Sequence, residues 1–194
     1  MGIAAVTVPL RRAIFLDRDG VLNRAIVRNG RPYPPGNMKE LEILAGVLQA
    51  LQALKRAGFL LIGVTNQPDV ARGSQKREDV EAINAALVKA LPLDEILVCY
   101  HDERDNCECR KPRPGLLVQA ARRHAIDLSS SFMIGDRWKD VEAGHRAGCA
   151  TFLIDCGYAE SRPDGILPDY TVHSLGQATT EILARLASSV RETL

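Results

Sequence analysis

Apolar positions along the chain follow two alternating patterns. Short apolar runs without polar alternation predict strands that are covered on both faces, as in a parallel sheet. Between them, apolar residues three or four apart predict helices. This alternation predicts an α/β fold built on a doubly wound, mostly parallel sheet with right-handed crossovers. The predicted strands are 13–16, 59–67, 95–100, 131–135, 151–154 and 170–172, and the predicted helices are 41–57, 75–90, one that begins at 114–115, and 175–190.

Polar side chains follow the predicted strands at the edge where their carboxyl ends should meet. Asp17 and Asp19 follow the first strand, and residues two apart on an extended chain project to the same side, so both carboxylates could share one divalent cation. Gly20 allows a sharp turn after them. Thr65 ends the second strand with a hydroxyl that can donate to a phosphoryl oxygen, and Asp136 follows the fourth. Ordinary turn chemistry explains each of these residues alone, but not the whole series.

A second constellation follows the third predicted strand. Cys99 and His101 are separated by five residues from Cys107 and Cys109. Residues two apart in an extended segment face the same way, so each pair can present both donors to one ion, and Cys₃His is an established zinc set. A coincidental cluster is the alternative. Four protein ligands predict a closed, structural zinc site that holds a loop in place.

Four motifs together resemble the haloacid dehalogenase superfamily of phosphatases. They are Asp17-Arg-Asp-Gly-Val-Leu-Asn23, Thr65-Asn-Gln67, the Arg-Lys-Pro that begins at Arg110, and Gly-Asp136-x-x-x-Asp140. The cysteine and histidine cluster before Arg110 resembles the branch of heptose bisphosphate and histidinol phosphate phosphatases. The resemblance covers roughly residues 11–175. It implies a Rossmann-like fold of this superfamily's type, without a separate cap domain, in which loop 24–40 and the zinc-bound loop could cover the site.

The resemblance implies Mg²⁺-dependent hydrolysis of a phosphate monoester through an aspartyl-phosphate. Asp17 would be the nucleophile, Asp19 would carry the proton, and Thr65 and Lys111 would neutralise the transferred phosphoryl group. Asp17, Asp136 and the backbone carbonyl of Asp19 would bind Mg²⁺, while Asp140 would orient water or Lys111. The expected substrate-binding residues are Asn23, Asn66, Gln67, Arg110 and Arg137, and the expected Zn²⁺ ligands are Cys99, His101, Cys107 and Cys109.

The branch also implies a substrate. Its heptose bisphosphate phosphatases imply removal of the 7-phosphate of D-glycero-D-manno-heptose 1,7-bisphosphate on the way to nucleotide-activated heptose and lipopolysaccharide. Loop 24–40 departs from the expected pattern, so histidinol phosphate stays an alternative substrate. The sequence does not determine the anomeric form of the sugar. Arg24, Arg28 and Arg31 could reach a second negative group, or simply solvate the loop. A phospho-acceptor signalling domain is the competing class, but Asp19 would promote turnover of the phosphate that such a domain must keep.

Composition narrows the picture further. A chain of 194 residues with 46% hydrophobic residues suits a single domain, 1–194. The net charge of +1 offers no global field for nucleic acid or an anionic membrane. The partner that the resemblance implies is a small-molecule sugar phosphate. No secretory signal or membrane-spanning run is visible, and the cysteine count of five is odd. These features predict a soluble cytoplasmic protein, and we expect a monomer.

Overall fold

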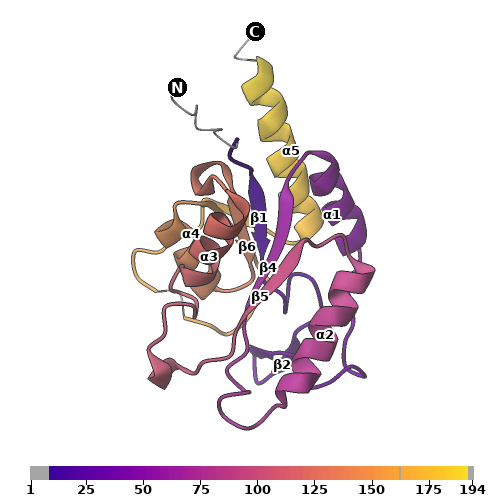
Figure 1. Ribbon diagram of the computed structural model, residues 1–194, viewed down its shortest axis with the longest axis vertical. Coiled ribbons are helices and arrows are strands. Elements are labelled where there is room, and N and C mark those ends of the chain that lie inside the picture. The colour runs from indigo at the N-terminus through magenta and orange to yellow at the C-terminus, as the bar shows by residue number, and fades with distance from the viewer. Residues whose placement is uncertain (1–8, 162, 192–194) are drawn as a thin grey trace, which may run out of the picture.

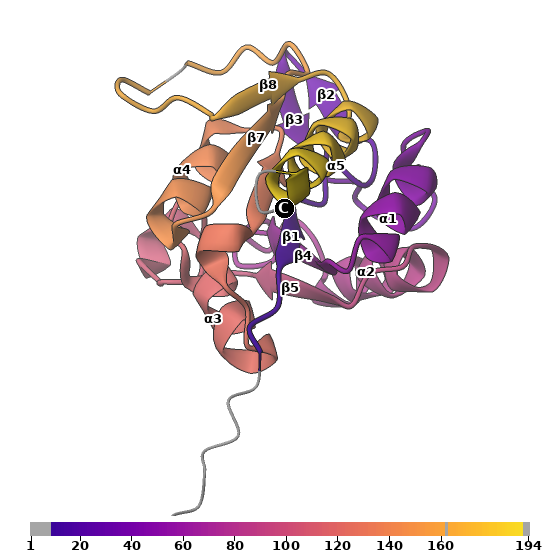
Figure 2. The ribbon, with the colours of Figure 1, turned by 90° about the horizontal axis from the view of Figure 1, so that it is seen from above.

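The computed structural model describes residues 9–161 and 163–191. Its centre is a six-stranded sheet in the order β5-β4-β1-β6-β7-β8, and every neighbouring pair is parallel. Helices α1, α2 and α5 lie on one side of this sheet and α3 and α4 on the other (Figures 1 and 2). The strands of the sheet are β1 (Ala13–Leu16), β4 (Leu60–Asn66), β5 (Glu95–Cys99), β6 (Phe132–Gly135), β7 (Ala150–Ile154) and β8 (Tyr170–Val172). The helices are α1 (Val47–Arg56), α2 (Arg77–Ala90), α3 (Gly115–His124), α4 (Trp138–Ala147) and α5 (Leu175–Arg191), with 3₁₀ turns at Glu103–Asp105 and Leu128–Ser130.

Strand β1 divides the hydrophobic core into two halves. Ile14 and Leu16 belong to the cluster that packs under α1, α2 and α5, whereas Ala13 and Phe15 belong to the cluster under α3. All four residues are wholly buried. Because successive side chains of a strand point to opposite faces, a strand covered on both sides has no position for a polar residue. The doubly wound parallel sheet predicted from the sequence is therefore confirmed.

The strand order reverses beside β1. The chain runs from β1 to β4 and β5 on one side, then returns to β6 on the other side of β1. Open α/β sheets place their ligands beyond the carboxyl ends of the strands at such a switch point. Asp17, Thr65 and Asp136 lie at that point, at the ends of β1, β4 and β6.

The segment 24–40 contains a hairpin that the sequence analysis missed. Strands β2 (Ile26–Arg28) and β3 (Arg31–Tyr33) pair antiparallel, and Asn29 and Gly30 join them with φ values of 50° and 72°. An Asn-Gly pair of this kind fits the tight turn that matches the twist of two strands. The three-residue strands, rich in arginine and proline, concealed that signal. The hairpin lies near the carboxyl ends of the central strands (Figure 1).

The predicted helix at 41–57 begins later than expected. Helix α1 starts at Val47 because Gly46, with φ of 79°, adopts a left-handed conformation that a helix cannot continue through. No separate cap domain covers the sheet edge in the described part of the chain. Within the same residues, no helix is long and apolar enough to cross a membrane.

Candidate active site

Three carboxylates gather at the end of β1 and β6. Oxygen atoms of Asp17, Asp136 and Asp140 all lie within 4.8 Å of one another. Burial and the nearby charge of Asp140 raise the pKa of Asp17 to about 6. Burial, followed by the charges of Asp17 and Asp140, raises the pKa of Asp136 well above its usual range. Complete ionisation of this cluster is unfavourable unless a cation offsets its charge.

The side chain of Asp136 fits a metal ligand. Both of its carboxylate oxygens are buried, and neither has a hydrogen bond of ordinary geometry from the described residues. The backbone of Gly20 packs against this carboxylate so closely that an added Cβ would lie 1.9 Å from Asp136 Oδ2. Gly20 also has φ of +88°, which other residues rarely adopt. A buried set of carboxylate oxygens is the donor chemistry that Mg²⁺ prefers.

Lys111 is the cation of this cluster. Its Nζ lies 2.8 Å from Asp17 Oδ1 and 2.6 Å from Asp140 Oδ1, and it donates a hydrogen bond to the carbonyl of Val64 at 2.7 Å. Burial alone would lower the pKa of Lys111, but the charges of Asp140 and Asp17 outweigh burial and raise it. The side chain amide of Asn66 holds the backbone of Lys111, donating to its carbonyl and accepting from its N–H. Lys111 is therefore fixed in position and stays charged.

The carboxylate of Asp19 faces a different set of groups. It accepts hydrogen bonds from Asn23 Nδ2 at 2.9 Å and Gln67 Nε2 at 2.8 Å, and from the guanidinium of Arg18. The carboxylate cluster around Asp17 contains Asp136 and Asp140 rather than Asp19, and a cation shared by the carboxylates of Asp17 and Asp19 stays a prediction. The chain turns after β1 instead of remaining extended, and Asp140 takes the third place in the carboxylate cluster.

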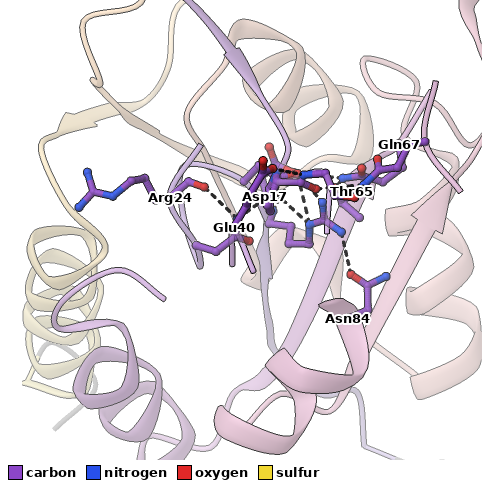
Figure 3. Close-up of polar contacts among 12 residues, drawn as sticks. Asp17, Arg24, Glu40, Thr65, Gln67 and Asn84 are labelled. Atoms are coloured by element: carbon purple, nitrogen blue, oxygen red, sulfur yellow. Dashed lines mark hydrogen bonds and ion pairs between the residues drawn. The ribbon is translucent and has the colours of Figure 1, made fainter. Parts of the chain in front are cut away.

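Sequence reasoning missed the role of Arg18 and Asn84. The Arg18 side chain is completely buried, with Nε and Nη2 on the carboxylate of Asp19 and Nη1 on Asn84 Oδ1 at 3.0 Å. Asn84 comes from α2 and reaches up to this network (Figure 3). An arginine between two functional carboxylates was visible in the sequence. Its partner, 66 residues away, was not.

The predicted substrate-binding residues divide into two groups. Asn23 and Gln67 are wholly buried and are hydrogen-bonded to Asp19, with Gln67 also donating to Thr65 Oγ1 at 2.9 Å. In Figure 3, Thr65 is drawn between Asp17 and Gln67. Direct substrate contacts of Asn23 and Gln67 stay predictions. The other three, Asn66, Arg110 and Arg137, line the cleft that leads to Asp17.

This cleft has a narrow inner end and a wider outer end. The inner end, of about 70 Å³, is lined by Asp17, Thr65 and Lys111, while the outer end has a volume of about 350 Å³. The two share Tyr33 of the hairpin and Arg137, so they form one continuous cleft. Cationic side chains dominate the charge of the outer end. They are Arg31, Arg72, Arg110, Arg137 and Lys139, beside the acids Asp69 and Glu103.

Two arginines expected near the substrate point elsewhere. Arg24 forms an exposed ion pair with Glu42, 2.7 Å away, and Arg28 stacks on the ring of Tyr33 at 5.7 Å. Neither lines the cleft described above. Of the three arginines of this segment, Arg31 lines the outer end, although Arg28 is its cross-strand partner in the hairpin.

The cysteine and histidine side chains converge after β5. Cys109 Sγ lies 3.1 Å from Cys99 Sγ and 3.4 Å from Cys107 Sγ, and His101 Nδ1 lies 3.3 Å from Cys109 Sγ. Four donors around one zinc ion at tetrahedral angles would have sulfur atoms roughly 3.8 Å apart, given Zn–S bonds near 2.3 Å. The cluster is therefore of the right composition and nearly the right size for Zn²⁺. It directly precedes Arg110 and Lys111.

Comparison with known proteins agrees with this geometry. The family model of HAD-hydrolase-like proteins matches residues 108–178. A protein of Helicobacter pylori strain J99 named D-glycero-β-D-manno-heptose-1,7-bisphosphate 7-phosphatase is 37% identical over 76% of this chain and 84% of its own length. The chain belongs to the HAD-like phosphatases. A Yersinia pestis protein of the same name is 34% identical to this phosphatase, over 89% of the chain and 96% of the relative.

Solved structures show the same fold. The D,D-heptose 1,7-bisphosphate phosphatase of B. bronchiseptica, solved with magnesium and phosphate, superimposes on this phosphatase with a TM-score of 0.74 at 31% identity, covering 90% of this chain and 99% of that one. A HAD-like phosphatase of Mesorhizobium loti gives a TM-score of 0.73 at 32% identity, over 94% and 90% of the two chains.

Proposed function

We propose that this phosphatase removes the 7-phosphate of D-glycero-β-D-manno-heptose 1,7-bisphosphate through an aspartyl-phosphate on Asp17. The observation that carries the proposal is the charge distribution along one cleft. Its inner end holds the carboxylates and Lys111, and its outer end is lined by cations. A substrate with two phosphates, one at each end of a sugar, matches both ends. The names of the relatives support the same sugar and anomer.

Asp17 Oδ2 is the oxygen we assign to the attack on phosphorus. Oδ1 is engaged by Lys111 Nζ and by the backbone N–H of Arg18, both at 2.8 Å. As the new bond to phosphorus forms, the ester bond to the sugar oxygen breaks, and Asp19 gives that oxygen a proton. Water then attacks the phosphoaspartate, gives its proton to Asp19, and releases phosphate and free Asp17.

The remaining groups position these atoms and neutralise charge. Lys111 and the hydroxyl of Thr65 lie at the inner end, where the transferred phosphoryl oxygens would be. Asp17, Asp136 and the backbone carbonyl of Asp19 would hold Mg²⁺, which would offset the negative charge of the phosphoryl group and of the carboxylates. Asp140 contacts Lys111, which supports an orienting role. A structural Zn²⁺ on the four-residue cluster would hold the segment that carries Arg110 and Lys111.

Histidinol phosphate fits this cleft less well. It has a single phosphate and carries an ammonium group, which would meet the cations of the outer end and be repelled. The experiment is a comparison of kcat/KM for both anomers of the heptose bisphosphate, the heptose 7-monophosphate and histidinol phosphate. We expect the β-bisphosphate to be hydrolysed most efficiently. A higher kcat/KM for histidinol phosphate would overturn the proposed substrate, while phosphate release from any of them would leave the phosphatase chemistry intact.

A further inference from the structure

Four of the five cations that line the outer end, all but Arg31, have carboxylate partners among the described residues. Arg137 Nη2 lies 2.5 Å from Glu160 Oε1, and Arg72 Nη2 lies 2.7 Å from Asp102 Oδ1. Glu103 differs from these acids because its carboxylate contacts two cations. Its Oε1 lies 2.9 Å from Lys139 Nζ and 3.6 Å from Arg110 Nη2, and Glu103 itself lines the outer end.

The backbone of Glu103 is fixed, whereas its side chain is free to move. Glu103 begins a short 3₁₀ turn in which Asp102 caps the backbone, and that turn lies between His101 and Cys107 of the metal-ligand cluster. The side chain, by contrast, is 66% exposed to solvent. Its carboxylate can therefore leave Lys139 and Arg110 and enter water without disturbing the fold.

We propose that Glu103 tunes substrate specificity by occupying, in the empty cleft, the place of the substrate's second phosphate. This inference rests on the bisphosphate substrate proposed above. A phosphate group carries up to two negative charges and three acceptor oxygens, against one charge and two oxygens for a carboxylate. The second phosphate displaces Glu103 from Lys139 and Arg110, whereas the 7-monophosphate, which lacks that group, leaves Glu103 in place.

Glu103 also acts after the reaction. The product keeps its second phosphate and so keeps its contact with Lys139 and Arg110. When Glu103 returns, it neutralises these cations and promotes release of the product. Glu103 thus lowers the affinity for substrate and product alike. The lower affinity for the anionic product speeds its release from the cleft.

The test compares Glu103→Gln with Glu108→Gln. Both changes remove one negative charge from the same loop, but Glu108 is 86% exposed, pairs with Arg113 at 3.5 Å and does not line the cleft. We expect Glu103→Gln to lower the KM for the bisphosphate about two- to fivefold, the size that exposed ion pairs reach. The inhibition constant of the heptose 1-phosphate product should fall by the same factor. The KM for the 7-monophosphate should shift less, and Glu108→Gln should change none of these constants.

Two results would overturn the role of Glu103. A higher KM for the bisphosphate in Glu103→Gln would mean that the carboxylate orders Lys139 and Arg110 for binding. An equal shift in Glu108→Gln would mean that only the overall charge of the loop matters. Zinc content and Tm of both variants verify that the fold is kept. If the wild-type enzyme itself shows no preference for the bisphosphate over the monophosphate, the proposed substrate fails first, and this inference fails with it.

Discussion

The charged groups deepest in the cleft are almost entirely removed from water, whereas most of those toward its outer end are partly exposed. The side chains of Lys111 and Asp140 are each 2% exposed, while those of Arg137 and Lys139 are each 37% exposed. A charge interaction away from water is several times stronger than the same interaction in water. The inner contacts therefore admit little change, and the outer ion pairs can be exchanged for contacts to a ligand.

The two ends also differ in the elements that carry them. Inner residues such as Asp17 and Asp136 sit at the ends of central strands, which the whole sheet holds in place. Outer residues such as Arg31 and Arg110 sit on the hairpin and on the loop that carries the metal-ligand cluster. In the proposed mechanism the attacking carboxylate and the Mg²⁺ ligands therefore come from strand ends, while the recognition residues come from loops, as in many α/β enzymes.

The largest effect is expected at the inner end. Asp17→Asn should lower kcat at least roughly a thousandfold, because an amide is a poor nucleophile and a poor ligand for Mg²⁺. Phosphate release measures the loss, and circular dichroism verifies the fold. The matched control is Glu78→Gln, an exposed residue of α2. Residual turnover of more than a few per cent in a preparation free of contaminating phosphatase would contradict the covalent route.

The second largest effect is expected from loss of zinc, because the proposed zinc-bound segment carries both Lys111 of the inner end and Arg110 of the outer end. We expect about one zinc per chain, bound by the cluster, and activity that also depends on added Mg²⁺. Cys107→Ser should lower zinc content and reduce kcat/KM about a hundredfold, because Lys111 and Arg110 would be displaced by an ångström or so. Cys156→Ser removes an exposed thiol outside the cluster, so zinc content and kcat/KM should both stay at the wild-type level. Elemental analysis that finds no zinc in wild-type protein prepared without chelator would contradict this prediction.

Removal of one outer cation should affect recognition alone. Arg110→Ala loses a charge-assisted contact of about 1.5–3 kcal/mol, so kcat/KM for the bisphosphate should fall roughly ten- to a hundredfold. Hydrolysis of p-nitrophenyl phosphate, which has no second phosphate, should change far less. Lys111→Ala should impair both substrates. If Arg110→Ala also impaired both equally, Arg110 would belong with the chemistry, and the contrast between the two ends would not hold.

The smallest effect is expected from Arg31→Ala, and comparison with Arg24→Ala in the same segment shows whether the position of the arginine matters. Arg31→Ala should lower kcat/KM for the bisphosphate about two- to fivefold, since its side chain is at the solvent edge of the cleft. Arg24→Ala should have no effect on this value, because Arg24 is paired with Glu42 away from the cleft. Steady-state kinetics with the bisphosphate distinguishes the two. Equal losses would show that loop charge, rather than position, attracts the substrate.

The sequence by itself determined the sheet and the residues at its edge. An apolar run such as Ala13–Leu16 predicts a strand covered on both faces, and the carboxyl ends of parallel strands meet at one edge. Asp17, Thr65 and Asp136 had to come together once those strands formed. The spacing of the cysteine and histidine donors likewise predicted their convergence. These conclusions need only local periodicity and one rule of topology. The cytoplasmic location and the monomeric state stay predictions.

Tertiary structure decided which way individual side chains point. The carboxylate of Asp19 accepts hydrogen bonds from Arg18, and Arg18 in turn donates to Asn84 of a distant helix. Glu103 meets Lys139 across 36 residues. Each of these contacts depends on how elements pack after the chain has folded, and a buried guanidinium takes whatever acceptor the packing provides. Local spacing carries no information about such partners, because they are brought together only by the arrangement of whole helices and loops.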